Sequence, residues 1–390
     1  MTDRFDGTPT TDVLVDEALA LGEGLVRPLR YVQVNSVLNG STGTIMRNLH
    51  ENLKARGVDS CIFWGRGAES QGDRERRFGS KAGVYRHVLM TRLTDRTGFY
   101  SKRDTANLLE QLDGIDPDVV HLHNLHGYYV NIEMLFGWLA NHRCQVRWTL
   151  HDCWAFTGHC PHFQYVRCDR WIDGCRDCPQ KRGYPSSLLL DSSRRNWEDK
   201  RRLFTSVPPE RMVLISPSHW LAGLLRQSFL KGYPVEVRHN TVDRRIFKPT
   251  TSDFRERYGI GDRFMILGVA SSWTERKGLG DFLRLANELD REKYAIVLVG
   301  LSKKQIKKLP ENVVGLERTS SKQELAGIYS AADIFFNPTR EDNYPTVNLE
   351  AEACGTRVAT FDTGGCWETI RLEQSYLSKS VEDFISLIEK

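Results

Sequence analysis

Short runs of β-branched and aromatic residues alternate with segments of helical periodicity along most of this chain, and the alternation starts twice. In the first half, strand-like runs cover 31–38, 59–65 and 145–152. After a turn-rich stretch the pattern restarts at 264–271. Strands that alternate with helices form parallel sheets whose two faces are covered by helices. The sequence therefore predicts an α/β protein with two parallel-sheet domains that face a central cleft, where ligands bind at the strand ends.

The length of 390 residues exceeds one ordinary domain and fits two of about 150 to 200 residues. We expect a polar N-terminal lead at 1–28, a first domain at 29–240 with a Cys-rich insert at 153–178, and a second domain at 241–390. The chain start is polar and no apolar run of about 18 residues occurs, so we expect a cytoplasmic protein. A net charge of +4 is too small to indicate nucleic acid as a partner.

The segment 341–355, EDNYPTVNLEAEACG, carries the clearest chemical signal. A short loop separates Asp342 from Glu350, and the helical pattern that starts at Val347 ends at Gly355. A loop that opens into a helix offers free backbone N–H groups and a positive dipole end, which suit phosphate. Glu350 lies about one turn inside this helix, where its carboxylate can accept from sugar or ribose hydroxyls. The segment predicts a site for a sugar linked to a diphosphate, and the alternative is an exposed amphipathic helix with ordinary surface acids.

Two further motifs follow predicted strands. The loop 39–43 contains Gly40 and Gly43, which allow the backbone to approach a ligand closely, although many strand-to-helix turns carry glycine. The segment 271–278, SSWTERKG, places Lys277 where a cation can meet a diphosphate, unless it is simply a solvated lysine at a helix start.

Histidines gather in HLHNLHG, residues 121–127, directly after another predicted strand. At the end of that strand, His123 can hydrogen-bond a sugar hydroxyl or a phosphate, whereas His121 is expected to point into the sheet. A single strand-end histidine is usually a hydrogen-bonded structural residue. The alternative for His123 is therefore a structural role.

The segment 341–355 resembles the glutamate-x7-glutamate motif of retaining GT-B glycosyltransferases of the glycosyl transferases group 1 type, with Asp342 where many relatives carry glutamate. Within that group the chain is most similar to bacterial exopolysaccharide enzymes of the colanic-acid type, which share the His-Asp-x-Trp signature at 151–154. The resemblance covers roughly residues 30–370. It implies a GT-B fold of two Rossmann-like domains and a retaining transfer from a nucleotide sugar to a glycan or lipid-linked acceptor in surface polysaccharide biosynthesis.

The resemblance also implies roles for individual residues. Asp342 would hold the sugar, unless Glu341 takes that place, and Glu350 would bind the ribose hydroxyls. Lys277 would hold the diphosphate, with Arg276 as a further candidate cation. The remaining donor-binding candidates are Gly40, Gly43, Ser272, Asn343, Thr346 and Val347. The catalytic set would be Asp342, Glu350, Lys277 and His123.

The acceptor would contact His151, Asp152 and Trp154, with the Trp154 ring as a stacking surface for a sugar, unless this tryptophan is simply core. Lysine, amides and the helix dipole would stabilise the leaving group, so no catalytic metal is expected. Two other functions stay open: another GT-B sugar-nucleotide enzyme, such as an epimerase or phosphorylase, and a non-catalytic nucleotide-sugar-binding scaffold.

Four cysteines, Cys160, Cys168, Cys175 and Cys178, lie within twenty residues of one another. In a chain without an export signal they are typical ligands of a tetrahedral structural zinc, although the spacing is not that of a standard zinc finger. Neutral packed thiols and a redox or disulfide role are the alternatives.

The stretch 66–103 holds ten Arg or Lys residues and four acids. Within it, Val84, Val88 and Leu89 fall near one helical face with arginines around them. The pattern predicts a basic amphipathic helix that contacts anionic lipid at the inner face of the membrane, or a solvated helix that packs on its own sheet.

Overall fold

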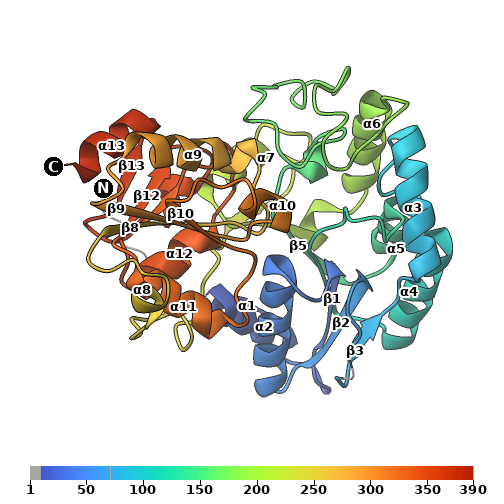
Figure 1. Ribbon diagram of the computed structural model, residues 1–390. Helices are drawn as coiled ribbons and strands as arrows, with labels where there is room; N and C mark the ends of the chain where they lie inside the picture. The colour runs from blue at the N-terminus through green and yellow to red at the C-terminus, as the bar shows by residue number, and fades with distance from the viewer. Residues whose placement is uncertain (1–9, 71, 390) are drawn as a thin grey trace. The chain divides into compact units, whose positions relative to one another are not determined.

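The computed structural model of the protein describes residues 10–70 and 72–389, so residues 1–9 of the expected N-terminal lead lie outside the described part. The chain divides into two compact units, of which the first ends at His239 and the second begins at Asn240 (Figure 1). Each unit contains a parallel sheet with helices packed on it. This is the α/β architecture of two Rossmann-like domains that the sequence predicts.

The sheet of the first unit has the strand order β3-β2-β1-β4-β5-β6-β7, and all neighbouring strands in it are parallel. Residues 31–36 of β1 are buried without interruption, as expected of a central strand covered on both faces. In chain order the strands are β1 (Arg30–Val37), β2 (Asp59–Arg66), β3 (Glu75–Arg77), β4 (Val119–Leu122), β5 (Gln145–Thr149), β6 (Met212–Ser216) and β7 (Val235–Val237).

The first helix of the chain is part of the core of the first unit. Leu14, Val15 and Ala18 on α1 are buried together with Tyr31 of β1. Residues 10–22 are therefore a packed helix, whereas the sequence indicated only a polar lead. The helices of this unit are α1 (Thr10–Gly22), α2 (Ser41–Ala55), α3 (Lys81–Thr94), α4 (Lys102–Ile115), α5 (Ile132–Asn141), α6 (Ser193–Phe204) and α7 (His219–Leu225), with short 3₁₀ turns η1 (Trp154–Phe156) and η2 (Pro209–Arg211).

The second unit repeats the plan with the strand order β10-β9-β8-β11-β12-β13, again parallel throughout. Its strands are β8 (Phe264–Val269), β9 (Tyr294–Val299), β10 (Val313–Leu316), β11 (Ile334–Asn337), β12 (Val358–Phe361) and β13 (Tyr376–Ser378). Its helices are α8 (Phe254–Arg257), α9 (Leu279–Glu288), α10 (Lys303–Ile306), α11 (Lys322–Ala331), α12 (Thr346–Ala353) and α13 (Val381–Ile388), with 3₁₀ turns η3 (Glu275–Lys277) and η4 (Cys366–Thr369).

Two apolar clusters cover the opposite faces of this second sheet. Ile266 of β8 belongs to one cluster, and its neighbours Met265 and Leu267 belong to the other. Because successive side chains of a strand point to opposite faces, this alternation shows that the sheet is buried on both sides. The loops that leave the strand ends are then the places where polar side chains can gather.

The basic helix expected within 66–103 is present as α3, but its exposed face differs from the prediction. Val84 and Val88 are half-buried, whereas Leu89 is exposed. The helix packs through the buried residues His87 and Thr91. The three apolar residues predicted to share a face therefore do not form one exposed stripe.

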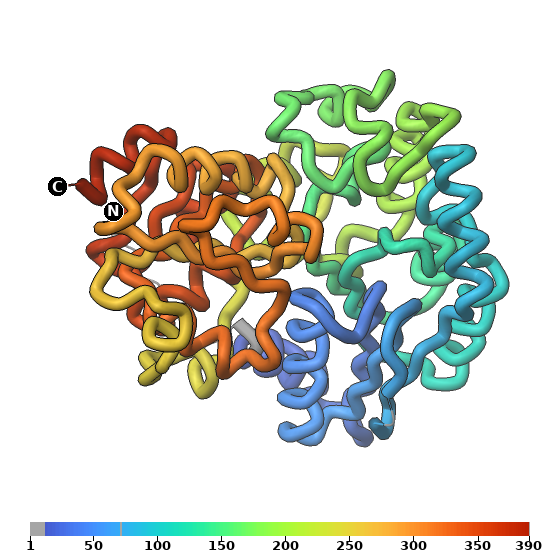
Figure 2. The backbone as a smooth tube through the Cα atoms, viewed as in Figure 1, coloured from blue at the N-terminus to red at the C-terminus, as the bar shows by residue number. Residues whose placement is uncertain are grey.

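The Cys-rich segment connects β5 to α6 and is irregular apart from the single turn of η1. Figure 2 shows it in green as a looping backbone path without a long regular helix or strand. A connection of this length without regular secondary structure is uncommon in a compact domain and usually serves a function.

Candidate functional site

The loop between β11 and α12 is held by a chain of buried amides. The Asn337 side chain donates to the Asn348 Oδ1 at 2.8 Å, and the Asn348 Nδ2 donates to the Thr369 Oγ1 at 2.8 Å. These bonds connect the end of a strand to the first turn of α12 and to η4. Because all these groups are neutral, the orientation of the helix start does not depend on an ion pair.

The start of α12 presents free backbone N–H groups. Its N-cap position is Pro345, and no side chain among residues 10–70 and 72–389 caps it by a hydrogen bond. Thr346 and Val347 form the first turn and are half-buried. Uncapped amides at the positive end of a helix dipole are suited to an anionic ligand.

A cation from a neighbouring strand end lies beside this loop. The Lys277 Nζ is 2.5 Å from the Asp342 Oδ2, and each side chain keeps about a fifth of its surface exposed. Gly278, which follows Lys277, has a φ of 79°, and a Cβ there would lie 2.5 Å from the Pro338 Cγ. Glycine is therefore required for the η3 turn to lie against the β11 loop.

The two adjacent acids of the loop have different surroundings. Glu341 is buried, with its Oε2 at 3.8 Å from the Arg276 Nε, and the Arg276 guanidinium also donates to the Glu341 carbonyl at 3.1 Å. Asp342 is partly exposed. Of the two candidates for contact with a sugar, Asp342 is the accessible one, and Arg276 fixes the loop from its other side.

Glu350 lies in α12 with a hydroxyl as its partner. The Tyr329 hydroxyl donates to the Glu350 Oε2 at 3.1 Å, and Tyr329 itself is fully buried. Burial raises the pKa of Glu350 to about 7, and the Tyr329 hydrogen bond only partly offsets this effect. A carboxylate in such surroundings gains from further hydroxyl donors, which a ribose supplies.

Lys277 contacts Asp342 of the loop, and Thr346, Val347 and Glu350 lie on the helix that follows this loop. We call these five residues the α12 cluster. Of the other predicted donor contacts in this unit, Ser272 is exposed and Asn343 is buried. The sequence did not indicate Tyr329, which would require knowledge that α11 packs beside α12. It also did not indicate Arg340, which pairs with Asp281, although its place just after β11 was a usable signal.

In the first unit, histidines follow the ends of β4 and β5. His121 points into the sheet as predicted, since its ring bonds the Tyr31 hydroxyl at 2.8 Å and the Thr149 hydroxyl at 2.7 Å. The ring of His123 lies 3.1 Å from the Gln33 Oε1 and 3.3 Å from the His151 Nε2. His123 is also only 1% exposed.

The hydrogen bonds of His123 define its tautomer. Because the Gln33 amide nitrogen donates to the Met46 carbonyl at 3.2 Å, the Gln33 oxygen faces His123 and accepts from its Nε2–H. The Nδ1 then accepts from His151. Both ring nitrogens are occupied, so in this conformation His123 orients His151 and does not offer a nitrogen to a ligand.

Burial and neighbouring imidazoles keep these rings neutral. Burial lowers the pKa of His123 well below its ordinary value, and His121 and His151 act in the same direction. Burial also lowers the pKa of His151 to about 4. His151 is nevertheless half-buried as a residue, whereas His123 is buried, so His151 is the more accessible histidine of this pair.

A second histidine contact involves a charged partner. The His126 Nε2 is 2.7 Å from the Asp152 Oδ2, and the His126 Nδ1 is 3.1 Å from the Tyr184 hydroxyl. Burial alone would raise the pKa of Asp152, but the charge and hydrogen bond of His126 lower it to about 2. Together, His123, His126, His151 and Asp152 form what we call the histidine cluster. Gln33 and Tyr184, which complete it, lie far from these residues in sequence and carry no recognisable motif.

The prediction that Trp154 offers a stacking surface to a sugar is wrong. Its side chain is 2% exposed and packs in the apolar core of the first unit. The Lys200 Nζ lies 3.4 Å from the centre of the Trp154 ring and donates to the Trp154 carbonyl at 2.8 Å. The tryptophan of this motif is therefore a structural residue, as the alternative interpretation held.

Glycine is favoured at positions 40 and 43 of the loop 39–43 for different structural reasons. Gly40 is exposed at the N-cap of α2, with a φ of 90° that favours glycine. Gly43 is buried, and a Cβ on it would lie 2.3 Å from the Leu38 carbonyl oxygen. Gly43 therefore serves the close packing of the loop on α2, and Gly40 is the one that faces solvent.

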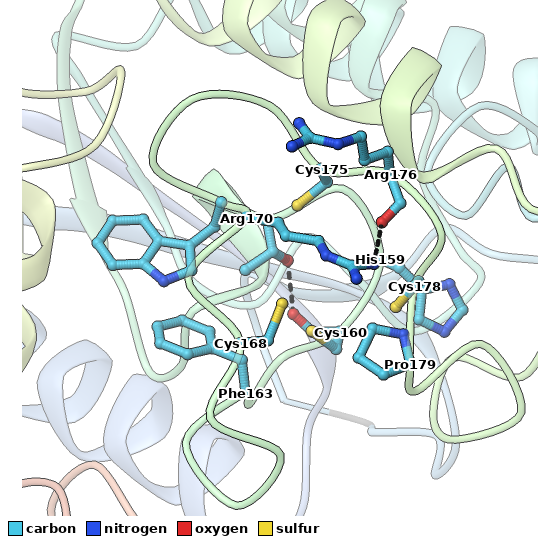
Figure 3. Close-up of a pocket in the computed structure, with 11 residues that line it drawn as sticks. His159, Cys160, Phe163, Cys168, Arg170, Cys175, Arg176, Cys178 and Pro179 are labelled. Carbon is cyan, nitrogen blue, oxygen red and sulfur yellow. Dashed lines mark hydrogen bonds between the residues drawn. The ribbon is translucent and has the colours of Figure 1, made fainter.

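The four predicted zinc ligands line a single pocket (Figure 3). All are free thiols. The Cys160 thiol donates a hydrogen bond to the Cys178 sulfur, which lowers the pKa of Cys178 to about 7.

Comparison with known proteins connects these clusters to a reaction class. Residues 42–246 match the sequence model of Glycosyltransferase Family 4, which is more than half of the chain, and residues 263–390 match that of Glycosyl transferases group 1. The chain belongs to this glycosyltransferase family. It is therefore an enzyme, as the resemblance of segment 341–355 predicts, and not a non-catalytic scaffold.

Named relatives share the family at low identity. A D-inositol 3-phosphate glycosyltransferase from Corynebacterium jeikeium is 24% identical over 355 residues, which cover 84% of this chain and 76% of the relative. A protein of the same name from Mycobacterium sp. (strain KMS) is 24% identical over 294 residues, which cover 70% of this chain and 61% of the relative.

Solved structures share the fold. Sucrose-phosphate synthase from Thermosynechococcus elongatus superimposes with a TM-score of 0.67 at 15% identity, over 93% of this chain and 89% of that one. Anabaena HepE in complex with UDP and glucose superimposes with a TM-score of 0.60 at 12% identity, over 92% and 89%. These likenesses establish the GT-B fold of this glycosyltransferase.

Proposed function

We propose that this glycosyltransferase transfers a sugar from a nucleoside diphosphate sugar to a lipid-linked glycan acceptor, with retention of the anomeric configuration, in surface polysaccharide biosynthesis. The observation that carries the proposal is the α12 cluster. There an uncapped helix start, a lysine and a buried carboxylate occur on adjoining elements of one unit. Such a set matches the diphosphate and ribose of one ligand.

The donor contacts follow from these surroundings. The amides of Thr346 and Val347 and the Lys277 ammonium would bind the diphosphate, and the Glu350 carboxylate would accept from the ribose hydroxyls. Asp342 would hold a hydroxyl of the sugar. The complexes of Anabaena HepE with UDP and with UDP-glucose support a nucleotide sugar as the donor, because the fold is shared.

Charge stabilisation in this scheme comes from the protein. As the glycosidic bond to the diphosphate breaks, negative charge grows on the departing phosphate, where a lysine and helix-start amides act without reorganisation. The proposed mechanism therefore requires no catalytic metal. We propose retention because the family resemblance implies it and because the described α12 cluster needs no protein nucleophile.

The first unit would bind the acceptor. His151 and His126 are partly exposed, and their neighbours His123, Asp152 and Tyr184 hold them in place. The neutral imidazole of His151 can both donate and accept hydrogen bonds, which suits sugar hydroxyls.

An exposed apolar surface supports a lipid-linked acceptor. Tyr85, Leu89 and Leu93 project from α3 with 75%, 57% and 37% of their surface exposed. The loop 188–190 adjoins them, because the Leu188 N–H donates to the Arg92 carbonyl at 2.7 Å and the Leu190 N–H donates to that of Leu93 at 3.3 Å. The side chains of Leu188, Leu189 and Leu190 are each more than half exposed.

We call these six residues the leucine surface. Arg86, Arg92 and Arg182 near it are exposed. Apolar side chains with arginines around them favour peripheral contact with an anionic membrane. No helix among the described residues is long and apolar enough to cross a membrane. We therefore propose that the enzyme works in the cytoplasm at the inner face of the membrane.

A soluble phosphorylated acceptor is the second candidate, because the relatives are named D-inositol 3-phosphate glycosyltransferases. The first test is a panel of sugar nucleotides, scored by the thermal shift of the full-length protein. The best donor is then incubated with membrane lipid extracts, with D-inositol 3-phosphate and with free phosphate. Transfer to lipid supports the proposal, whereas transfer only to a soluble phosphate ester contradicts the acceptor class.

The donor site is tested by Glu350→Ala, with Glu373→Ala as the matched control because Glu373 is exposed and lies outside the α12 cluster. We expect the first variant to lose the thermal shift with UDP-sugars and the control to keep it. Full donor binding by Glu350→Ala would overturn the site assignment. Donor turnover without any acceptor, or only with free phosphate, would point to an epimerase or phosphorylase.

Membrane contact is tested by co-sedimentation with vesicles that contain anionic lipid. We expect the wild type to sediment with anionic vesicles, and to do so less at high salt. A variant with Leu188→Ser, Leu189→Ser and Leu190→Ser should stay in the supernatant. An Ile172→Ser variant is the control, because Ile172 is 48% exposed and is not part of the leucine surface. Equal sedimentation of all three proteins would contradict this surface as the contact.

A further inference from the structure

The cysteine pocket of the first unit has features that packed neutral thiols do not explain. Four cysteines reach it from three separate turns of the irregular connection between β5 and α6. Figure 3 shows Cys175, Cys168, Cys160 and Cys178 around one space, with the Arg170 side chain extending across it. On one side, stacked aromatic rings of Phe163 and Trp171 close the pocket, with ring centres 5.2 Å apart. The other sides carry the sulfurs.

The sulfurs lie among hydrogen-bond donors and cations. The backbone N–H of Gly158 donates to the Cys175 Sγ at 3.1 Å. The Arg170 guanidinium donates to the carbonyl of Arg176 at 2.8 Å and so lies over the Cys175-x-x-Cys178 turn. Buried Lys200 donates to the carbonyl of Thr157, a residue that lines the pocket, at 3.0 Å. Hydrogen-bond donors placed in this way can stabilise sulfur atoms that ligate a metal ion.

A buried histidine in the same pocket carries an unsatisfied nitrogen. His159 has a fully buried side chain, and its Nδ1 bonds the carboxylate of Asp95. Its Nε2 is buried and has no hydrogen-bond partner among residues 10–70 and 72–389. A buried polar atom without a partner is costly, so this nitrogen would gain an acceptor if the cysteines closed around a metal ion and brought a sulfur to it.

We propose that Cys160, Cys168, Cys175 and Cys178 together bind one structural Zn²⁺ ion, with His159 outside the ligand set as a donor to one of the coordinated sulfurs. Four thiols lose their protons to solvent as four Zn–S bonds form. The resulting centre carries two negative charges. Arg170 and Arg176 line the pocket and are positioned to compensate them.

The thiols must move together to form this centre. No three of these sulfurs lie within 4.8 Å of one another among the described residues, whereas a tetrahedral zinc with Zn–S bonds of about 2.3 Å brings sulfurs to about 3.8 Å. Three of the cysteines are only half-buried and lie in irregular backbone, so side-chain rotation and small loop shifts can close this gap.

A zinc at this place would support the histidine cluster. Asp152 and Tyr184 both contact His126, and both belong to the same connection, one before the cysteines and one after them. A metal that holds the middle of the connection would therefore fix the distance between these two contacts. The role proposed for it is structural, because four thiolate ligands leave no open coordination position.

The test is elemental analysis of the purified full-length protein, followed by release of the metal with a thiol-blocking mercurial. We expect about one zinc per chain in the wild type. Cys178→Ser should lose most of it. Cys366→Ser is the matched control, because Cys366 is a buried cysteine of the other unit and should keep full zinc. His159→Gln should also keep it, whereas its loss in that variant would place His159 among the ligands and overturn the proposed set.

A second measurement covers the case in which Cys178→Ser does not fold. The wild-type protein is exchanged with Co²⁺, and a tetrahedral thiolate site gives intense sulfur-to-cobalt charge-transfer absorption. Only traces of zinc together with the absence of these bands would overturn the proposal. So would a mass decrease that shows a disulfide among the four cysteines in freshly purified protein. None of these readouts depends on glycosyltransferase activity.

Discussion

The α12 cluster and the histidine cluster are both placed at strand ends, yet they differ in charge and exposure. In the α12 cluster, Lys277 and Asp342 are charged and partly open to solvent. In the histidine cluster, His123 is buried and neutral, and its geometry is set by hydrogen bonds to other protein groups. The first arrangement can exchange an internal partner for a charged ligand. The second is fixed before any ligand arrives and can recognise hydroxyls by geometry alone.

The largest expected effect is a loss of stability when Trp154, in the core of the unit that holds the histidine cluster, is replaced. Trp154→Ala should lower the free energy of unfolding by about 3 to 5 kcal/mol, because a large buried ring is lost from the core. Trp367→Ala is the matched control, since Trp367 is 48% exposed, and should change stability little. Denaturant unfolding measures both. Normal stability of Trp154→Ala with weaker acceptor binding would instead restore Trp154 as a ligand contact.

The role of charge in the α12 cluster is tested by the Lys277→Met variant. We expect kcat to fall by about 10²- to 10³-fold, because a cation that stabilises charge on the leaving phosphate is lost. The melting temperature should change little, since the Lys277–Asp342 pair is partly exposed. Lys303→Met, at an exposed lysine of α10, serves as the control. A stable Lys277→Met variant with wild-type kcat would remove this lysine from the mechanism.

The two clusters should also differ in pH dependence. Because burial raises the pKa of Glu350 to about 7, donor affinity should rise about tenfold from pH 6 to pH 8 as the carboxylate ionises. The associated contribution to stability has the opposite direction: it is present below pH 4.5, the ordinary value, and is lost as the pH rises through 7.

Titration calorimetry with UDP at several pH values measures this dependence, and Glu350→Gln should abolish it. His151 and His123 should add no pH dependence to acceptor binding over the same range, because burial lowers the pKa of His151 to about 4 and that of His123 well below its ordinary value. A pH dependence that Glu350→Gln retains would assign the titration to another group.

The smallest expected effect is that of His123→Gln. The side-chain amide can still bond Gln33, but the contact that orients His151 is weakened. Loss of about one hydrogen bond should raise the acceptor KM by about 2- to 10-fold and leave the donor KM unchanged. Steady-state kinetics with each substrate varied separately distinguish the two. A larger effect on the donor would place His123 at the transferred sugar, as the resemblance implied.

The sequence predicted the central strands because buried parallel strands are continuous apolar runs. It missed β3, β10 and β13, which are strands of three or four residues at sheet edges, and β3 is entirely charged. Asp342 and Glu350 could be proposed as site residues because their spacing is local. The roles of Tyr329, Gln33 and Tyr184 could not be found, since each depends on which helix or loop packs beside it. Trp154 was misassigned because exposure is not encoded by a motif.

The Asp342 carboxylate would compete with an anionic ligand for the Lys277 ammonium. Asp342 already pairs with Lys277 and is part of the same chain, so it cannot diffuse away. An anion that binds Lys277 would therefore have to displace it. A lone phosphate offers too few contacts to do so, whereas a nucleoside diphosphate sugar also brings a ribose and a hexose. We therefore expect inorganic phosphate to inhibit the wild type weakly and the Asp342→Asn variant more strongly. The ion pair would then reduce the binding of the small anions that are abundant in the cell.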